Sequence, residues 1–369
     1  METDILMCKF IVIISRYGRL LTQLLEYSYC QIASNALGYN SEAISKAAVS
    51  PEMVNALVNR PATGNYPSQD WLKTLQGGLL KVAPPGLDKI VTAQSGSEAN
   101  EIAYKSAFML HQRLKRGEGV EWTAEEMTSS LNNSLPGSPE LAILSFQGSF
   151  HGRGIGSLAT TRSKALHKMD IPTFDWPQAP FPALKYPLEA HSIENAAMEQ
   201  QGLLSVETLI KTWKFPVAGL IVEPIQSEGG DNHASPEFFQ GLRAITKRHG
   251  VTMIVDEVQT GMLLSDLNLC LTFLTTSPVL GFGPTGKFWA HEYWDLASPP
   301  DIVTFSKKAQ SAGFYFQDHR LVPDKPYRHF NTWLGDPARV MMSKAVVQEI
   351  LNKRLVEQAV CASHKPFGS

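Results

Sequence analysis

The feature that most constrains this chain is the alternation of short apolar segments with longer helix-like segments. Five apolar segments are predicted to be buried strands: Lys89–Ala93, Leu141–Phe146, Val217–Val222, Val251–Val255 and Ile302–Phe305. This alternation predicts an α/β fold, with a mainly parallel sheet and helices on both faces, in which ligands bind beyond the carboxyl ends of the strands. The polar residues that follow the strands are therefore the candidate binding residues.

The helices are predicted from the spacing of apolar residues and from start signals. They are Ser41–Arg60, which Pro51 would split, Trp71–Val82, Ser97–Leu114, Pro236–His249 and a last helix that Asp336 and Pro337 open and that ends near Val356. Residues 115–140 are polar and rich in Ser, Asn and Gly. We predict that they form a surface excursion.

Charge and cysteine content exclude several function classes. The 369 residues include 33 basic and 35 acidic side chains, a net charge of -2, with no basic stripe for nucleic acid and no polybasic membrane segment. The four cysteines lie far apart and form no CxxC pair, so neither a disulfide framework nor a metal site is predicted. We expect small-molecule partners and copies of the chain itself, in a reducing compartment.

Two apolar stretches bear on the membrane question. The first residues carry Glu2 and Asp4, are broken by Lys9 and lack a small-residue cleavage site, so no signal peptide is predicted. Residues 267–274 are too few to span a bilayer, which needs roughly 20 apolar residues. We expect a soluble protein in the cytoplasm, with the mitochondrial matrix as the alternative compartment.

Two polar segments follow directly on predicted strands. Lys307 comes just after Ile302–Phe305, where its amine can reach a ligand at the strand ends. Asp256 follows Val251–Val255, and a buried carboxylate there needs a positive or proton-donating partner. The pyridinium nitrogen of pyridoxal phosphate would be such a partner. The alternative for Asp256 alone is a capping or salt-bridge role.

Two further segments carry residues suited to anionic groups. The turn Ser95–Asn100 opens a helix, where free N–H groups and the helix dipole can receive a phosphate. The segment Ser149–Arg153 places an aromatic ring beside a glycine and an arginine that can bind a carboxylate in bidentate fashion. His151 by itself is predicted to be a structural histidine.

Together these segments resemble the class III aminotransferases, and their amino-acid sequences are similar to those of the 4-aminobutyrate (GABA) aminotransferase group. The similar stretches occur in family order over most of residues 31–340 and include QSGSEANEIAYKSAFM, SFQGSFHGRGIG, EPIQSEGGD, VDEVQTG, DIVTFSKK and PYRHFNTWLGDP. The resemblance implies a fold type I transferase that uses pyridoxal phosphate.

The resemblance also implies roles for individual residues. Lys307 would be the catalytic lysine that holds the cofactor, and Lys308 would be its neighbour. The other implied cofactor contacts are Asp256 with the pyridine nitrogen, Gln259 with the ring hydroxyl, Phe150 stacked on the ring, Gly96 and Ser97 at the phosphate, and Thr332 at the phosphate of the other subunit of a homodimer. The implied substrate-binding residues are Arg153, Glu223 and Glu228.

The activity implied by the resemblance is transfer of the amino group of GABA to 2-oxoglutarate, giving succinate semialdehyde and glutamate. Two alternatives are a catalytically impaired or inactive truncated homologue and an enzyme for another ω-amino acid such as β-alanine. Some members of the group bind an iron-sulfur cluster through a CxxC at the phosphate turn. Ser95 and Glu98 occupy those positions here, so no cluster is expected.

Three regions are expected along the chain. Residues 1–60 would form an N-terminal segment belonging to a small domain, and 61–335 the large cofactor-binding domain. Residues 336–369 would begin an interdomain helix and a truncated C-terminal domain. Within the large domain, 262–281 is an apolar block with no counterpart in the family, and we expect it and the early end of the chain to impair complete transamination.

Overall fold

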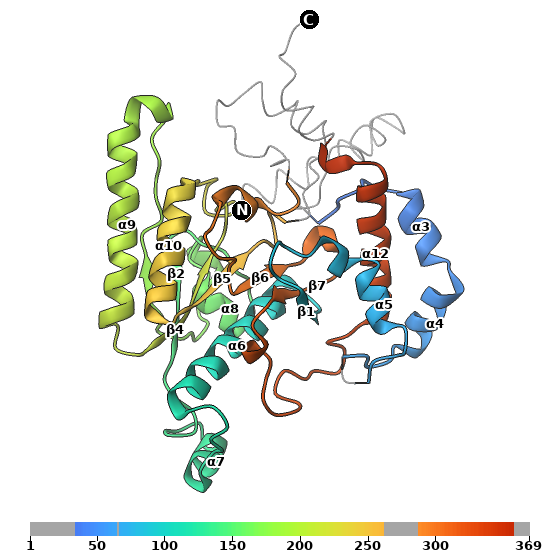
Figure 1. Ribbon diagram of the computed structural model, residues 1–369, viewed down its shortest axis with the longest axis horizontal. Coiled ribbons are helices and arrows are strands. Elements are labelled where there is room, and N and C mark those ends of the chain that lie inside the picture. The colour runs from blue at the N-terminus through green and yellow to red at the C-terminus, as the bar shows by residue number, and fades with distance from the viewer. Residues whose placement is uncertain (1–33, 65, 262–286, 358–369) are drawn as a thin grey trace, which may run out of the picture.

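The computed structural model describes residues 34–64, 66–261 and 287–357, and within them a seven-stranded sheet forms the centre of the molecule (Figure 1). The strand order is β1-β7-β6-β5-β4-β2-β3. The strands are β1 (Lys89–Ala93), β2 (Ala142–Phe146), β3 (Gln178–Ala179), β4 (Val217–Val222), β5 (Thr252–Asp256), β6 (Ile302–Phe305) and β7 (Ala312–Phe316). All five predicted strands are present, within one residue of their predicted bounds.

The sheet is mainly parallel, as predicted. Strands β2 to β6 are all parallel to one another, whereas β7 is antiparallel to its neighbours β1 and β6. The sequence analysis missed β7 and β3. Strand β7 follows β6 after a single short turn and contains Gly313, and β3 has only two residues, so neither produces a strand-helix-strand pattern.

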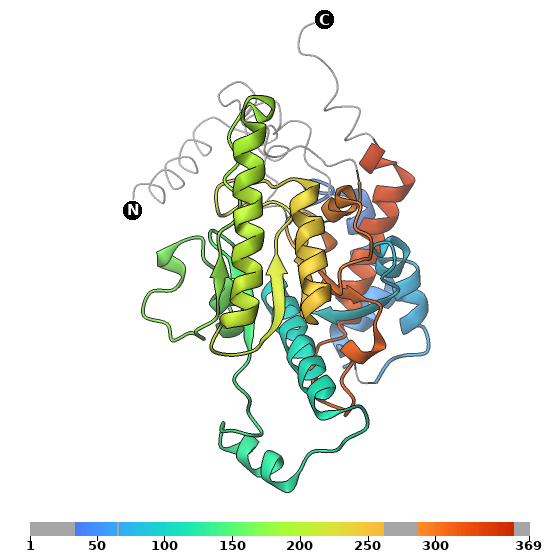
Figure 2. The same ribbon diagram turned by 60° about the vertical axis from the view of Figure 1, so that its left-hand side comes forward.

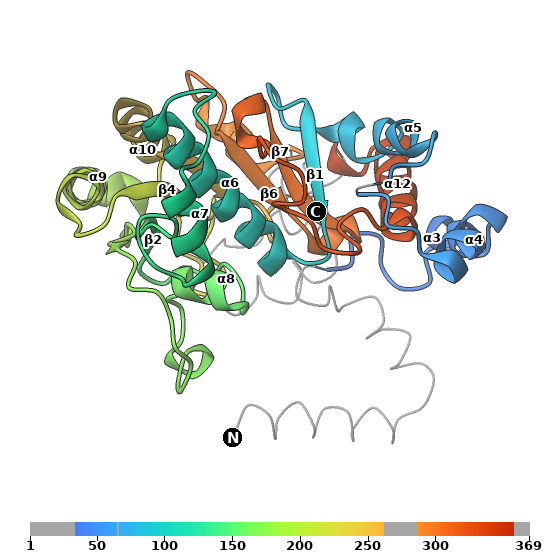
Figure 3. The same cartoon turned by 90° about the horizontal axis from the view of Figure 1, so that it is seen from below.

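Helices cover both faces of the sheet (Figures 2 and 3). Helices α6 (Gly96–Arg116) and α8 (Ile155–Thr160) lie on one face, and α9 (Ser192–Thr212) and α10 (Pro236–His249) lie on the other. The connection from β1 to β2 through α6 runs across the sheet in the opposite direction from the connections through α9 and α10. Right-handed crossovers therefore place these helices on opposite faces.

The N-terminal and C-terminal helices of the described chain pack together beside β1 and β7 (Figure 1). Pro51 splits the first predicted helix into α3 (Glu42–Ala48) and α4 (Pro51–Asn59), as expected. Trp71–Val82 forms α5 (Trp71–Gln76) and a 3-10 turn at Leu79–Val82 rather than one helix. The last helix, α12 (Pro337–Asn352), is capped by Asp336 and ends before the predicted Val356.

The predicted surface excursion contains a helix that the sequence analysis did not expect, α7 (Ala124–Leu131), which projects from the body of the molecule (Figure 1). Thr123 and Glu126 form a capping box at its start. No residue of α7 is buried, so local capping rather than packing defines this helix. Its polar sequence therefore lacks the apolar periodicity on which the helix prediction relied.

Some sequence features lie outside the described residues. They are the extra block expected at 262–281, the apolar run 267–274 and all four cysteines. Among the helices that the structure describes, none combines the length and apolar character needed to cross a bilayer. Within the same residues, no group of three or more His, Cys, Asp or Glu side chains is arranged to hold a metal ion.

The sheet brings three strand ends to one edge. Strands β4, β5 and β6 are adjacent and parallel, and Glu223, Asp256 and Ser306 stand at or just after their carboxyl ends. The segment after β2, which contains Phe150, opens at the same edge because β2 is parallel to β4. The functional candidates therefore converge although they are far apart in sequence.

Position 313 in β7 requires a glycine, because both its backbone conformation and the space around it exclude a side chain. Its φ is +154°, and a Cβ atom there would overlap the carbonyl oxygen of Val91 on β1. We predict that Gly313→Ala lowers the free energy of unfolding by about 3 kcal/mol or more, because a clash is added to backbone strain. Gly250, at φ +65° with open space around it, is the matched control. Gly250→Ala should cost about 1–2 kcal/mol. Equal losses in denaturant unfolding would contradict this account.

Candidate active site

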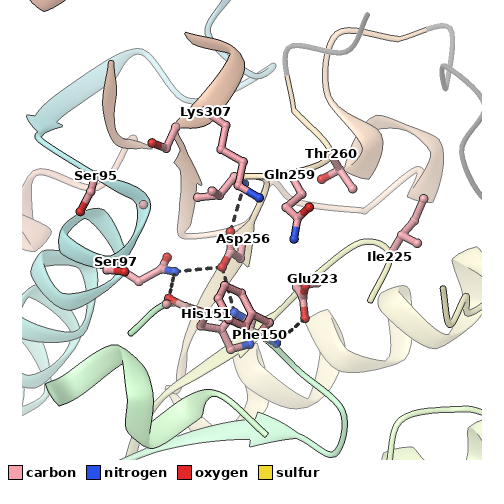
Figure 4. Close-up of a pocket in the computed structure, with 15 residues that line it drawn as sticks. Ser95, Ser97, Phe150, His151, Glu223, Ile225, Asp256, Gln259, Thr260 and Lys307 are labelled. Carbon is pink, nitrogen blue, oxygen red and sulfur yellow. Dashed lines mark hydrogen bonds and ion pairs between the residues drawn. The ribbon is translucent and has the colours of Figure 1, made fainter. Parts of the chain in front are cut away.

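A cavity of about 280 Å³ lies at the carboxyl edge of the sheet (Figure 4). Its walls come from the start of α6, the segment after β2, the ends of β4 and β5, and the residues after β6. The volume is close to the lower end of the range for small-molecule sites, about 300–1,000 Å³. The cavity brings together seven predicted site residues, Gly96, Ser97, Phe150, Glu223, Asp256, Gln259 and Lys307.

Asp256 is the buried carboxylate at the floor of this cavity. Its Oδ2 accepts hydrogen bonds from Asn100 Nδ2 and His151 Nδ1, both at 2.9 Å, and its Oδ1 accepts one from the backbone N–H of Val258 at 3.0 Å. These three donors surround a side chain that is only 5% exposed. A carboxylate held by donors in this way suits a cationic or proton-bearing ring atom.

Asn100 and His151 hold the Asp256 carboxylate, and the sequence analysis did not assign either of them to the site. Asn100 Nδ2 also donates to the carbonyl of His151 at 2.8 Å, so one amide joins α6, the segment after β2 and the end of β5. Asn100 lies one helical turn after Gly96, and this i, i+4 spacing was the one available signal. His151 was predicted to be structural, and its contact with Asp256 is a supporting one.

The start of α6 forms the anion-facing wall. Ser95 caps the helix by accepting the N–H of Glu98, and the first N–H groups of a helix have no partner within it. A Cβ atom on Gly96 would lie 2.8 Å from Val258, so glycine keeps the helix end close to the turn after β5. Free N–H groups with the helix dipole suit a phosphate.

Phe150 and Glu223 form the opposite wall. Glu223 Oε2 accepts the backbone N–H of Phe150 at 2.9 Å, which ties the aromatic residue to the end of β4. Burial raises the pKa of Glu223 well above its usual range, and the negative charge of Asp256 raises it further. The hydrogen bond from Phe150 and the charge of Lys307 act in the opposite direction but are smaller effects. Burial therefore favours the protonated form of Glu223.

Lys307 and Lys308 point in different directions. The side chain of Lys307 extends into the cavity above Asp256 and Gln259 (Figure 4). Its φ is +47°, a conformation that costs about 1–2 kcal/mol for an L residue and that clusters at functional sites. Lys308 instead donates to the carbonyl oxygens of Gln259 and Gly261. The structure therefore presents Lys307, and not Lys308, to a ligand in the cavity.

Three predicted site residues do not line the cavity. Arg153 is exposed, with its guanidinium 5.4 Å from the Phe150 ring centroid and 3.4 Å from His167 Nε2. Glu228 forms an ion pair with Lys164 at 3.1 Å. Thr332 is exposed, in a segment whose neighbours Asn331 and Trp333 bond to Glu98 and Gln94 beside the start of α6.

The residues present fit pyridoxal phosphate. A helix end with glycine at the close approach suits its phosphate, a buried anionic carboxylate suits its ring nitrogen, and a cavity-facing amine suits its aldehyde. These groups enclose one cavity rather than separate sites. The fold and the cavity thus define a transferase of the pyridoxal-phosphate-dependent fold type I class.

Comparisons with known proteins agree with this class. The family described as aminotransferase class-III matches residues 24–265 and 279–365. The unmatched interval, 266–278, lies inside the extra block expected from the sequence. The lysine aminotransferase from M. tuberculosis has a similar structure, with a TM-score of 0.68 and 27% identity, covering 90% of this chain and 69% of that one.

Curated relatives are more similar in sequence. A 4-aminobutyrate aminotransferase from Emericella nidulans is 58% identical over 330 residues, which are 89% of this chain and 62% of the relative. A 4-aminobutyrate aminotransferase from Sus scrofa, named mitochondrial, is 46% identical over 90% of this chain and 63% of its own length. The chain belongs to the class III aminotransferases, whose cofactor is pyridoxal phosphate, and it spans somewhat less than two thirds of these relatives.

Glu223 gives the apoprotein a testable pH dependence. In the unfolded chain a glutamate ionises near pH 4.3, whereas folded Glu223 keeps its proton to higher pH. The folded state then binds more protons above that value, so Glu223 makes stability fall as pH rises. We predict that Glu223→Gln becomes increasingly stable relative to the wild type as the pH rises above the unfolded pKa, in urea unfolding without cofactor. A difference that is constant or shrinks with pH would contradict the assignment.

Proposed function

We propose that this chain is a 4-aminobutyrate:2-oxoglutarate aminotransferase, with Lys307 as its catalytic lysine. The observation that carries the proposal is one cavity that joins the Lys307 amine, the Asp256 carboxylate and the start of α6, with Arg153 beside Phe150. The names of the relatives from Emericella nidulans and Sus scrofa support the choice of substrate.

In this proposal, pyridoxal phosphate supplies an electron sink for the bond broken at the amine-bearing carbon. Asp256 would hold the proton on the ring nitrogen, and Gln259 would hydrogen-bond the ring hydroxyl. Phe150 would pack on the ring, and the N–H groups at Gly96 and Ser97 would bind the phosphate. Lys307 Nζ would hold the cofactor and would move a proton at the amine-bearing carbon as general base and general acid.

Arg153 is the proposed receptor for the substrate carboxylate. Its guanidinium lies near the Phe150 ring that forms one cavity wall, and a bidentate fork binds carboxylates better than a point charge does. Burial and the positive charge of Arg153 lower the pKa of neighbouring His167, so this imidazole is neutral near pH 7. His167 therefore adds no second charge there, and Arg153 remains the charged group that would recognise the carboxylate.

Glu223 and Glu228 are proposed to complete substrate recognition. A protonated Glu223 can donate a hydrogen bond inside the cavity, which an ionised carboxylate could not do. Glu228 pairs with Lys164 at 3.1 Å, with a third of its side chain exposed. Because this pair is partly solvated, its net stabilisation is small, about 1 kcal/mol or less. Glu228 could therefore exchange Lys164 for another cation during the two half-reactions at modest cost.

We also propose a homodimer in which Thr332 reaches the phosphate site of the other subunit. Two observations support this: Thr332 is exposed, and its segment is fixed beside the start of α6. Residues 61–335 would be the cofactor-binding domain. Residues 1–60 would belong to a small domain, and 336–369 would begin an interdomain helix and a C-terminal domain; the packing of Met53 and Ala56 against Ala338 supports contact between these two parts.

The compartment can be tested separately. The word mitochondrial in the name of the Sus scrofa relative supports the matrix, the alternative to the cytoplasm. Imaging of the full chain fused at its C-terminus to a fluorescent protein distinguishes the two compartments.

Arg153→Lys tests the substrate assignment. We predict that it raises KM for GABA by about tenfold or more, because an ammonium cannot reproduce the bidentate guanidinium contact. The dissociation constant of pyridoxal phosphate should change less than threefold. Amino donors with and without a carboxylate, GABA, β-alanine and an alkylamine, provide the comparison. Equal losses for all three donors would show that Arg153 does not bind the carboxylate, and β-alanine preferred over GABA would favour the alternative donor.

A further inference from the structure

Lys308 stands next to the proposed catalytic lysine but is used differently. It lies in a 3-10 turn, Lys307–Ala309, whose first residue has a φ of +47°. Lys307 lines the cavity, whereas the Lys308 amine donates to carbonyls of the segment after β5. Only 4% of Lys308 is exposed, so its ammonium is a buried charge that requires acceptors.

Two acceptors of Lys308 belong to one short turn, residues 256–261. Lys308 Nζ donates to the carbonyl of Gln259 and, at 3.2 Å, to that of Gly261. The same turn carries the Asp256 carboxylate and the Gln259 amide, both of which line the cavity. Lys308 thus anchors, through two backbone carbonyls, the segment whose side chains would contact the cofactor ring.

The rest of the turn is held by hydrogen bonds that do not involve Lys308. Glu257 Oε1 accepts His291 Nδ1 and the N–H of His291, both at 2.8 Å, and Glu257 Oε2 accepts the hydroxyl of Thr260. Within the turn, Gly261 N–H donates to the Glu257 carbonyl at 2.8 Å. These bonds fix Glu257 and Thr260, whereas the bonds from Lys308 fix the Gln259 and Gly261 carbonyls. Without Lys308, Gln259 would lose a side-chain anchor on its backbone.

We propose that Lys308 is a positioning residue that holds Asp256 and Gln259 against the cofactor ring through the carbonyls of Gln259 and Gly261. This inference rests on the proposed cofactor site. It also gives the two consecutive lysines complementary tasks: Lys307 binds the cofactor covalently, and Lys308 orders the turn that contacts the ring. Removing the Lys308 amine would loosen non-covalent contacts while leaving the amine of Lys307 in place.

The test compares Lys308→Met with a matched variant, Lys105→Met, in the full chain. Lys105 on α6 also donates to a backbone carbonyl, that of Arg328 at 2.6 Å, but it does not line the cavity. The first readout needs no cofactor: hydrogen exchange of the backbone amides in 256–261. In Lys308→Met, exchange at Val258 and Gly261 should accelerate about tenfold, equivalent to about 1.4 kcal/mol. Lys105→Met should match the wild type.

The second readout is the affinity and visible absorbance of added pyridoxal phosphate. Lys308→Met should raise its dissociation constant about tenfold or more and shift its absorbance maximum, because Asp256 and Gln259 no longer hold the ring in one position. Lys308→Arg, which keeps the charge and the donors, should recover part of the affinity. If Lys308→Met does not fold, Lys308→Gln, which keeps one donor group, replaces it, and both readouts are compared with those of the wild type and Lys105→Met.

Three results would overturn the proposal. They are wild-type exchange in Lys308→Met, wild-type cofactor affinity with an unchanged spectrum, or an equal effect of Lys105→Met on both readouts. Failure of the proposed function has a different signature, because the wild-type chain itself would then bind no pyridoxal phosphate. The exchange readout would still report on Lys308 in that case.

Discussion

The hydrogen-bonded carboxylate of Asp256 is the interaction on which the rest of the site depends. It joins three parts of the chain, since Asn100 comes from α6, His151 from the segment after β2, and Asp256 from the end of β5. A buried carboxylate is costly unless donors satisfy its oxygens. The two bonds from Asn100 and His151 therefore tie the cavity walls to one another and satisfy the carboxylate that would face a protonated ring nitrogen.

The sheet topology brings the residues of this site together. Parallel β4, β5 and β6 bring Glu223, Asp256 and Lys307 to one edge of the sheet. Electrostatics then separates the two carboxyl groups: Asp256 has three donors, whereas Glu223 accepts one backbone N–H and lies in the field of Asp256. Two neighbouring acids thereby have different surroundings: the donors around Asp256 suit a cationic ring, and burial favours the protonated, hydrogen-bond-donating form of Glu223.

Features that neighbouring residues encode could be predicted from the sequence, whereas contacts between distant residues could not. Strands such as Val217–Val222 are continuous apolar runs, and residues directly after them, such as Asp256, could be placed at the sheet edge. Asn100 could not be assigned, because its partner is 156 residues away and no local pattern encodes that contact. Helix α7 and strand β7 were missed for a related reason, since capping and antiparallel pairing define them rather than periodicity. The choice of Lys307 over Lys308 came from family resemblance, and the opposite directions of the two side chains now support it.

The central claim is that Lys307 faces a cofactor held by Asp256. The most direct measurement is to saturate the full chain with pyridoxal phosphate, reduce it with borohydride and locate the modified lysine by peptide mass spectrometry. This account predicts one cofactor per chain, attached to Lys307, and a much lower yield when Asp256 is replaced by Ala. Modification of Lys308, or equal labelling of several surface lysines that is insensitive to Asp256, would contradict it.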